Sequence, residues 1–122
     1  MAKKILVVDD SLTVRAQVSA ALTGGGFEVV EATDGADALA QVAAHSDLSL
    51  VICDVNMPNM DGIEFLEKSR GANTTGALPV LMLTTEGQVA LMERAKRAGA
   101  KGWMVKPFKP LLLLAAARKL AV

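Results

Sequence analysis

Four apolar runs in the sequence each end on residues that can bind a metal ion or a phosphoryl group. These residues are Asp9 and Asp10, Asp54, Thr84, and Lys106. Three carboxylates brought together repel one another, so either a pKa must rise or a cation must bind between them. Oxygen ligands without His or Cys favour Mg²⁺, which keeps several waters and binds one or two carboxylates together with phosphate oxygens. If the ends of these runs meet in space, the aspartates form a magnesium site.

Lys106 and Thr84 add the groups that a bound phosphoryl group needs. The lysine ammonium is a point charge suited to a phosphoryl oxygen, and the threonine hydroxyl is a hydrogen-bond donor. Together with a carboxylate and Mg²⁺ they can form and hold an aspartyl phosphate, because that chemistry depends mainly on positioning and charge neutralisation. None of these residues is specific alone: Asp9 and Asp10 could simply cap a helix, and threonine is common in strands.

The apolar runs alternate with segments of helical periodicity. Strands are predicted at residues 5–8, 27–32, 48–53, 78–83 and 101–105. Helices are predicted from Ser11 to the glycines at 24–26, over 35–44, after Asp61, over 88–98 and from Pro110. Apolar runs without polar alternation are typical of strands buried on both faces, and caps, glycines and Pro110 mark helix ends. This alternation predicts one α/β domain, a parallel sheet covered by helices on both faces.

The expected position of the site follows from this fold class. In open α/β sheets, sites lie outside the carboxyl ends of the strands, near the point where the strand order reverses. Strand 27–32 is the one predicted strand that ends without a comparable polar group. If that strand lies at an edge of the sheet, the other four strand ends are neighbours.

Two predicted helices have informative apolar patterns. The first places Leu12, Val14, Val18, Ala21 and Leu22 at helical spacing. The last contains the run 111–117, which is apolar all round where a surface helix normally has a polar face. Exposed apolar positions on that helix predict a surface for a partner, or for weak self-association of a monomer. High helix propensity explains the same run equally well.

Composition excludes several classes of protein. The chain has 122 residues, the usual size of one domain, and its 13 basic and 13 acidic residues balance. A net charge of zero argues against nucleic-acid or membrane-surface binding driven by bulk charge. No apolar stretch approaches the ~20 residues of a membrane span, and Cys53 alone cannot form an intramolecular disulfide. We expect a cytoplasmic protein with no nucleic-acid partner and no membrane insertion.

The motifs taken together resemble a known family. Asp9-Asp10, Asp54, Thr84, Lys106-Pro107-Phe108 and the loop 54–62 are similar to the signature of response-regulator receiver domains in two-component systems. The stretch from Asp9 to Arg15 resembles that of single-domain, CheY-like chemotaxis receivers. The resemblance covers the whole chain and implies a receiver domain over residues 1–122. It also implies a flavodoxin-like (βα)5 doubly wound sandwich whose five-stranded parallel sheet has the order 2-1-3-4-5.

The resemblance implies a role for each matching residue. Asp54 would accept a phosphoryl group from a sensor histidine kinase of the CheA type. Asp10, Asp54 and the backbone carbonyl of Asn56 would ligate Mg²⁺, and Asp9 would assist through water. Lys106 would contact the phosphoryl group.

The resemblance further implies a switch rather than an enzyme, although the protein would assist its own phosphorylation and dephosphorylation. Thr84 would be the switch hydroxyl and Trp103 the switch aromatic residue, while Asn56 and Glu86 would tune the lifetime of the phosphoryl group. The signal would leave through the face formed by helix 88–98, strand 101–105 and the last helix, toward a target such as the flagellar motor switch.

Three other functions remain open at this level. A phosphorelay shuttle or phosphate sink, acting with a histidine phosphotransfer protein, would use the same site. A phosphatase of the haloacid dehalogenase type also forms an aspartyl phosphate, but its nucleophile resembles Asp-x-Asp after the first strand, whereas Asp54 follows the third. A flavodoxin-like cofactor carrier needs a phosphate-binding loop after the first strand, where Asp9 and Asp10 would repel it.

Overall fold

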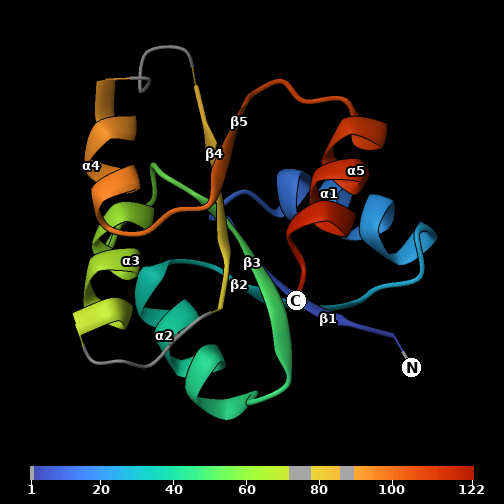
Figure 1. Cartoon of the computed structure of the whole chain (residues 1–122), viewed down its shortest axis with the longest axis horizontal. Coiled ribbons are helices and arrows are strands. Elements are labelled where there is room, and N and C mark those ends of the chain that lie inside the picture. The colour runs from blue at the N-terminus through green and yellow to red at the C-terminus, as the bar shows by residue number, and fades with distance from the viewer. Residues whose placement is uncertain (1, 72–77, 86–89) are drawn as a thin grey trace.

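The computed structural model of the chain describes residues 2–71, 78–85 and 90–122. Within these residues, five parallel strands form one sheet in the order β2-β1-β3-β4-β5 (Figure 1). The order reverses at β1, so β2 and β5 are the edges and the other three strands are central. The predicted flavodoxin-like topology is therefore confirmed.

Strands and helices alternate along the chain. Their bounds are β1 (Lys4–Val8), α1 (Leu12–Gly24), β2 (Glu28–Ala32), α2 (Gly35–Ala44), β3 (Leu48–Asp54), α3 (Gly62–Gly71), β4 (Val80–Thr84), α4 (Met92–Arg97), β5 (Gly102–Val105) and α5 (Pro110–Leu120). No helix among the described residues is both long and apolar enough to cross a bilayer.

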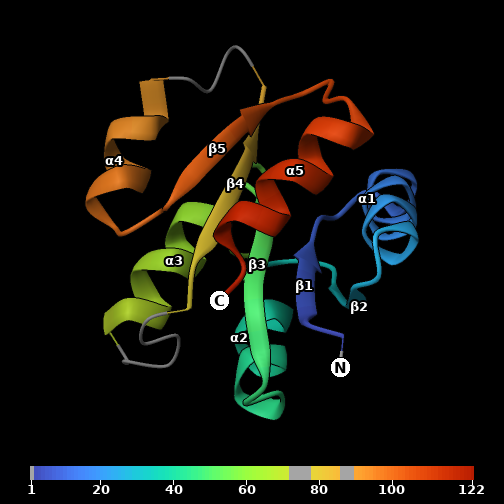
Figure 2. The ribbon, with the colours of Figure 1, turned by 45° about the vertical axis from the view of Figure 1, so that its right-hand side comes forward.

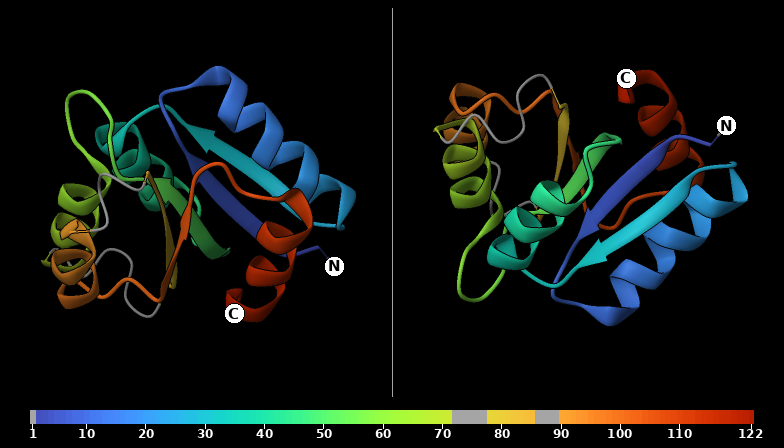
Figure 3. Two further views of the ribbon diagram at one scale, coloured as in Figure 1. Left: turned by 90° about the horizontal axis from the view of Figure 1, so that it is seen from above. Right: turned by 90° about the horizontal axis from the view of Figure 1, so that it is seen from below.

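Two layers of helices cover the sheet. Helices α1 and α5 lie on one face, and α2, α3 and α4 lie on the other, as the views from above and below show (Figure 3). The position of β1 between these two layers explains why its sequence lacks polar alternation. Ile5 and Val7 pack in the core under α1 and α5, whereas Leu6 and Val8 pack in the core under the other three helices, and all four are fully buried. A strand buried on both faces needs apolar residues at every position.

Local sequence signals start the helices. The Ser11 hydroxyl accepts a hydrogen bond from the Val14 amide, and Asp34 caps α2 in the same way through the Asp37 amide. The Asp61 carboxylate accepts from the Glu64 amide at the start of α3, and Pro110 occupies the first turn of α5. The predicted cap at Asp61 and the predicted starts near Ser11 and at Pro110 are confirmed.

Two predicted boundaries differ from the structure by more than one residue. Strand β4 begins at Val80 rather than at 78, because Pro79 has no amide hydrogen to contribute to the ladder and only its carbonyl pairs, with the Val51 amide. Helix α4 proper begins at Met92 rather than at 88, and residues 86–89 lie outside the described part of the chain.

The apolar patterns of α1 and α5 are only partly buried. Val18 and Leu22 are fully buried as predicted, but Leu12 is 71% exposed, because it precedes Val14 by two residues and therefore points to nearly the opposite side of the helix. On α5, Leu113 is buried while Leu111 is 80% exposed. This helix therefore presents leucines to solvent as well as to the core.

Candidate functional site

The strand order brings the four polar strand ends together. Strands β1, β3, β4 and β5 are consecutive neighbours, and their registers align the carboxyl ends: Val8 pairs with Cys53, Asp54 with Leu83, and Thr84 with Val105. Strand β2 lies at the edge, as the sequence argument requires. The residues that follow these strands therefore share one end of the sheet.

Asp9, Asp10 and Asp54 form a cluster of acids at this end. One carboxylate oxygen from each lies within 4.8 Å of the others. Asp9 and Asp54 are buried, whereas Asp10 is exposed. Three hard oxygen donors with one side open to water suit Mg²⁺, which keeps part of its hydration shell when it binds a protein. The residues present therefore fit a magnesium ion.

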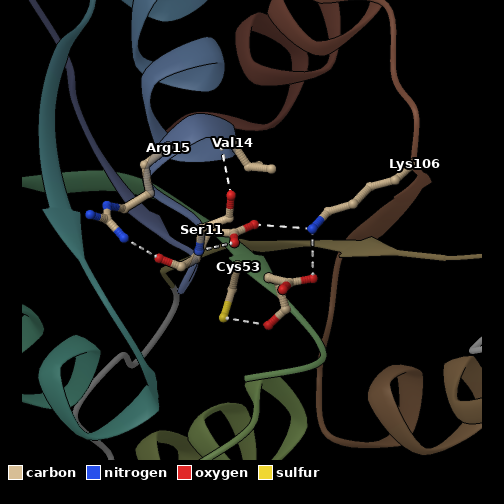
Figure 4. Close-up of polar contacts among 7 residues, drawn as sticks. Ser11, Val14, Arg15, Cys53 and Lys106 are labelled. Atoms are coloured by element: carbon tan, nitrogen blue, oxygen red, sulfur yellow. Dashed lines mark hydrogen bonds and ion pairs between the residues drawn. The ribbon is translucent and has the colours of Figure 1, made fainter. Parts of the chain in front are cut away.

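Lys106 binds two of these acids. Its Nζ donates to Asp54 Oδ1 at 3.0 Å and to Asp9 Oδ2 at 3.1 Å (Figure 4). The Lys106 backbone amide donates to the Thr84 carbonyl, which anchors the residue to the end of β4. Asp9 is held a second time, because its Oδ1 accepts from the Ser11 amide at 2.9 Å. Ser11, and not either aspartate, is the residue that caps α1.

The pKa shifts show where charge is poorly compensated. Burial raises the pKa of Asp54, the nearby charge of Asp9 raises it further, and the hydrogen bond from Lys106 only partly opposes them. Burial by itself lowers the pKa of Lys106, but the hydrogen bonds and charges of Asp54 and Asp9 outweigh it, and the pKa rises. Lys106 thus supplies one positive charge to two buried carboxylates, so the cluster keeps an excess of negative charge.

Thr84 and Cys53 are the other buried polar groups beside the cluster. Thr84 ends β4 with no exposed surface, and its hydroxyl oxygen has no hydrogen-bond partner among the described residues. A buried hydroxyl without a partner lowers the stability of the fold by roughly 1–3 kcal/mol, and a bound hydrogen-bond acceptor would remove that loss. The Cys53 thiol donates to the Asp54 carbonyl, and burial raises the pKa of this thiol well above its ordinary value. Cys53 is therefore an unreactive core residue.

Three further predicted site residues are exposed or cannot be placed. Asn56 is exposed in the loop that follows β3. Trp103 lies on β5, in register with Met82, and is 46% exposed. Glu86 lies outside the described residues.

Sequence reasoning gave no role to two residues that touch the site. Arg15 donates from Nη1 to the Asp9 carbonyl at 2.7 Å. At Gly62, a Cβ atom would overlap the Asp54 carbonyl oxygen. Neither residue forms part of a recognisable strand end. Both residues belong to stretches that carry the family resemblance, Arg15 to residues 9–15 and Gly62 to the loop 54–62, but no role was assigned to either.

A groove lies beside Lys106, against α1. Its volume is about 780 Å³, and it runs between α1 and the segment that connects β5 to α5. Val14 and Ala21 line one side, and Pro107 and Phe108 line the other. Lys106 lines it as well, so the groove shares one residue with the site.

Comparison with known proteins identifies the family. Residues 5–118 match the response regulator receiver domain. The chain is 40% identical to chemotaxis protein CheY1 of Helicobacter pylori over 90% of both chains, and 40% identical to a CheY homologue of Campylobacter jejuni over 90% of this chain and 85% of the other. The crystallised chemotaxis protein CheY4 of Vibrio cholerae superposes with a TM-score of 0.90 at 41% identity, over 98% of this chain and 99% of that one. The chain belongs to the response-regulator receiver family, as a receiver domain of the CheY type.

Proposed function

We propose that this chain is a chemotaxis response regulator that accepts a phosphoryl group on Asp54 from a sensor histidine kinase, in a reaction that requires Mg²⁺. Receivers of this family act as phosphoacceptor switches and bind Mg²⁺ at an acidic pocket. The observation that carries the proposal is the pairing of Asp54 with Lys106 at 3.0 Å beside two further acids. The two relatives named above are chemotaxis proteins, which supports the pathway.

Asp54 has the properties of the phosphoacceptor. Its Oδ1 is held by Lys106, while Oδ2 accepts no hydrogen bond from a described residue. Oδ2 is thus available to form a bond to phosphorus as the bond from phosphorus to the donor histidine nitrogen breaks, and the electron pair leaves with that nitrogen.

The other residues hold charge during the transfer. Asp10, Asp54 and the Asn56 carbonyl would hold Mg²⁺, with Asp9 assisting through water, and the bound ion supplies neutralisation of the phosphoryl oxygens. Lys106 supplies a second positive charge to one of these oxygens. Thr84 supplies a hydroxyl donor that lacks a partner among the described residues and gains one when Asp54 is phosphorylated.

The output follows from the movement of Thr84. Phosphorylation adds a charge of about −1.5 to −2 together with strong acceptor oxygens. When Thr84 moves toward them, it leaves space into which Trp103 rotates from its exposed position on β5. The face formed by α4, β5 and α5, with β5 at the edge of the sheet and one helix on either side of it (Figure 2), then changes shape for a target such as the flagellar motor switch. Exposed Leu111 and Leu112 on α5 extend that face.

Intact mass spectrometry tests the phosphoacceptor. Incubation with Mg²⁺ and acetyl phosphate is expected to add one phosphoryl group, and Asp54→Asn or chelation of Mg²⁺ is expected to prevent it. Asp61→Asn is a matched control that removes another carboxylate of the same loop and should still be modified. Modification of Asp54→Asn to the same extent would place the acceptor elsewhere.

Tryptophan fluorescence tests the switch, because Trp103 is the single tryptophan of the chain. Its quenching by acrylamide should decrease on phosphorylation, and Thr84→Ala should lose most of that decrease while still accepting the phosphoryl group. Unchanged quenching in the phosphorylated protein would exclude inward rotation of Trp103.

A further inference from the structure

Arg15 joins helix α1 to the peptide between the two adjacent aspartates. Its Nη1 donates to the Asp9 carbonyl at 2.7 Å, and its Nε donates to Glu31 Oε1 on β2 at 3.0 Å (Figure 4 draws the first of these contacts). The Arg15 side chain is 13% exposed and that of Glu31 is 45% exposed. The guanidinium group therefore bridges the start of α1, the end of β1 and the edge strand.

The Asp9 carbonyl matters because it belongs to the same planar peptide unit as the Asp10 amide. The Asp9 carboxylate is fixed directly, by the Ser11 amide and by Lys106. The Asp10 carboxylate is exposed, and no hydrogen bond or ion pair connects it to the part of the chain that the structure describes. Its position in the acidic cluster therefore depends on the orientation of the backbone, which Arg15 holds from the carbonyl side.

The geometry of α1 explains why Arg15 can do this. The helix begins at Leu12 with Ser11 as its cap, so Arg15 lies in the first turn. Side chains of a helix tilt toward its N-terminus, which directs the guanidinium back toward Asp9. The planar fork of arginine offers separate donors to two acceptors, and a lysine offers only one compact group.

Glu31 compensates the charge of Arg15. A guanidinium group near three carboxylates would compete electrostatically with a divalent cation at the same site. The ion pair with Glu31 lets Arg15 hydrogen-bond to the Asp9 carbonyl with little net charge beside the cluster. It also fixes the rotamer of Arg15 from the side away from the acids.

We propose that Arg15 is a positioning residue for the metal-binding carboxylate of Asp10, oriented and neutralised by Glu31. This inference rests on the proposed function, because it concerns the Mg²⁺ site of that mechanism. Arg15 touches neither the metal nor the phosphoryl group, and it acts through the peptide between Asp9 and Asp10.

Titration calorimetry with MgCl₂ tests the inference without reference to phosphorylation. Arg15→Met keeps the length of the side chain and removes its donors, and it is expected to weaken Mg²⁺ binding about tenfold, the lower end of the effect of groups that orient metal ligands. Arg15→Lys should lie between Arg15→Met and the unaltered chain. Arg118→Met, on the exposed side of α5, is the matched control and should bind like the unaltered chain.

The pair Arg15 and Glu31 should behave as a unit. Glu31→Gln leaves the positive charge of Arg15 uncompensated and should weaken Mg²⁺ binding by less than Arg15→Met does. Added salt should reduce this effect of Glu31→Gln. The double variant should bind Mg²⁺ no more weakly than Arg15→Met, since Glu31 acts only through Arg15. A merely structural role would lower the unfolding midpoint of the metal-free protein and leave the affinity of the folded protein unchanged.

The outcomes separate this inference from the proposed function. Unaltered Mg²⁺ affinity in Arg15→Met, or additive losses in the double variant, would overturn the role of Arg15 alone. Absence of Mg²⁺ binding in the unaltered chain would overturn the proposed metal site itself, and this inference with it.

Discussion

The ammonium group of Lys106 lies 3.0 Å from a carboxylate oxygen of Asp54, although the two residues are 52 positions apart in the sequence. The same nitrogen binds Asp9. One cation is thus shared by two buried anions, and the exposed Asp10 adds a third negative charge within 4.8 Å. This imbalance gives the end of the sheet its affinity for positive charge.

Removal of the shared cation should destabilise the fold. Lys106→Met leaves Asp9 and Asp54 buried without it, and breaking a buried pair costs about 3–5 kcal/mol. Because Lys106 is 21% exposed, we expect a smaller loss at pH 7, about 1–3 kcal/mol of unfolding free energy in urea titrations. Lys109→Met, an exposed lysine nearby, should change it by less than about 0.5 kcal/mol. Equal effects of the two variants would mean that the pair contributes nothing to stability.

The raised pKa of Lys106 also sets a pH dependence. The folded state binds this proton more tightly than the unfolded chain, whose lysine has a pKa near 10.5. The stabilisation is therefore complete below 10.5 and disappears as the pH rises through the folded value. Lys106→Met should lack this alkaline loss of stability.

Asp54 should affect the pH dependence of the unfolding free energy in the opposite direction to an ordinary ion-paired acid. Burial and Asp9 raise its pKa above 3.8, so the unfolded chain releases this proton first and folding stability falls as the pH rises through that interval. Asp54→Asn has no proton to release there. We expect its unfolding free energy to exceed that of the unaltered chain at pH 7, by about 0.5–3 kcal/mol, and the difference to shrink toward pH 3.5. A difference that does not depend on pH would contradict the raised pKa.

Mg²⁺ should stabilise the folded chain, since the three acids converge only after folding. At one hundred times its dissociation constant, the ion should raise the unfolding free energy by about 2.7 kcal/mol. Urea unfolding with Mg²⁺ and with excess EDTA measures the difference. Asp10→Asn, at an exposed position, should fold normally but lose most of the stabilisation by Mg²⁺. Full stabilisation of that variant would mean that the ion binds elsewhere.

Gly62 should tolerate no side chain. In Gly62→Ala the new Cβ meets the Asp54 carbonyl oxygen, a backbone atom that cannot move aside without moving the Asp54 side chain. We expect a loss of about 1–3 kcal/mol of unfolding free energy and slower phosphorylation by acetyl phosphate. Gly24→Ala is the matched control: nothing lies within 4 Å of its Cβ at the end of α1, so it should be neutral or stabilising by up to about 1 kcal/mol. Wild-type behaviour of Gly62→Ala would show that this loop adjusts freely.

The sequence by itself was sufficient for the elements and for the membership of the acidic cluster. Ser11, Asp61 and Pro110 start their helices through contacts within three residues or through a fixed backbone angle, and such signals are legible in a short stretch. The polar residues at the strand ends were predictable for a related reason. In a parallel sheet all strands point the same way, so their carboxyl ends meet once the strand order is known.

Only the tertiary structure decided which site residues are buried and which of them contact one another. Asp9 is buried and Asp10 exposed although they are adjacent and chemically identical, and Lys106 reaches Asp9 across 97 positions. Arg15 reaches back from α1 to the Asp9 carbonyl. These outcomes depend on where each helix sits along the sheet. That position is set by packing of the two whole layers against the strands, and no local pattern of residues encodes it.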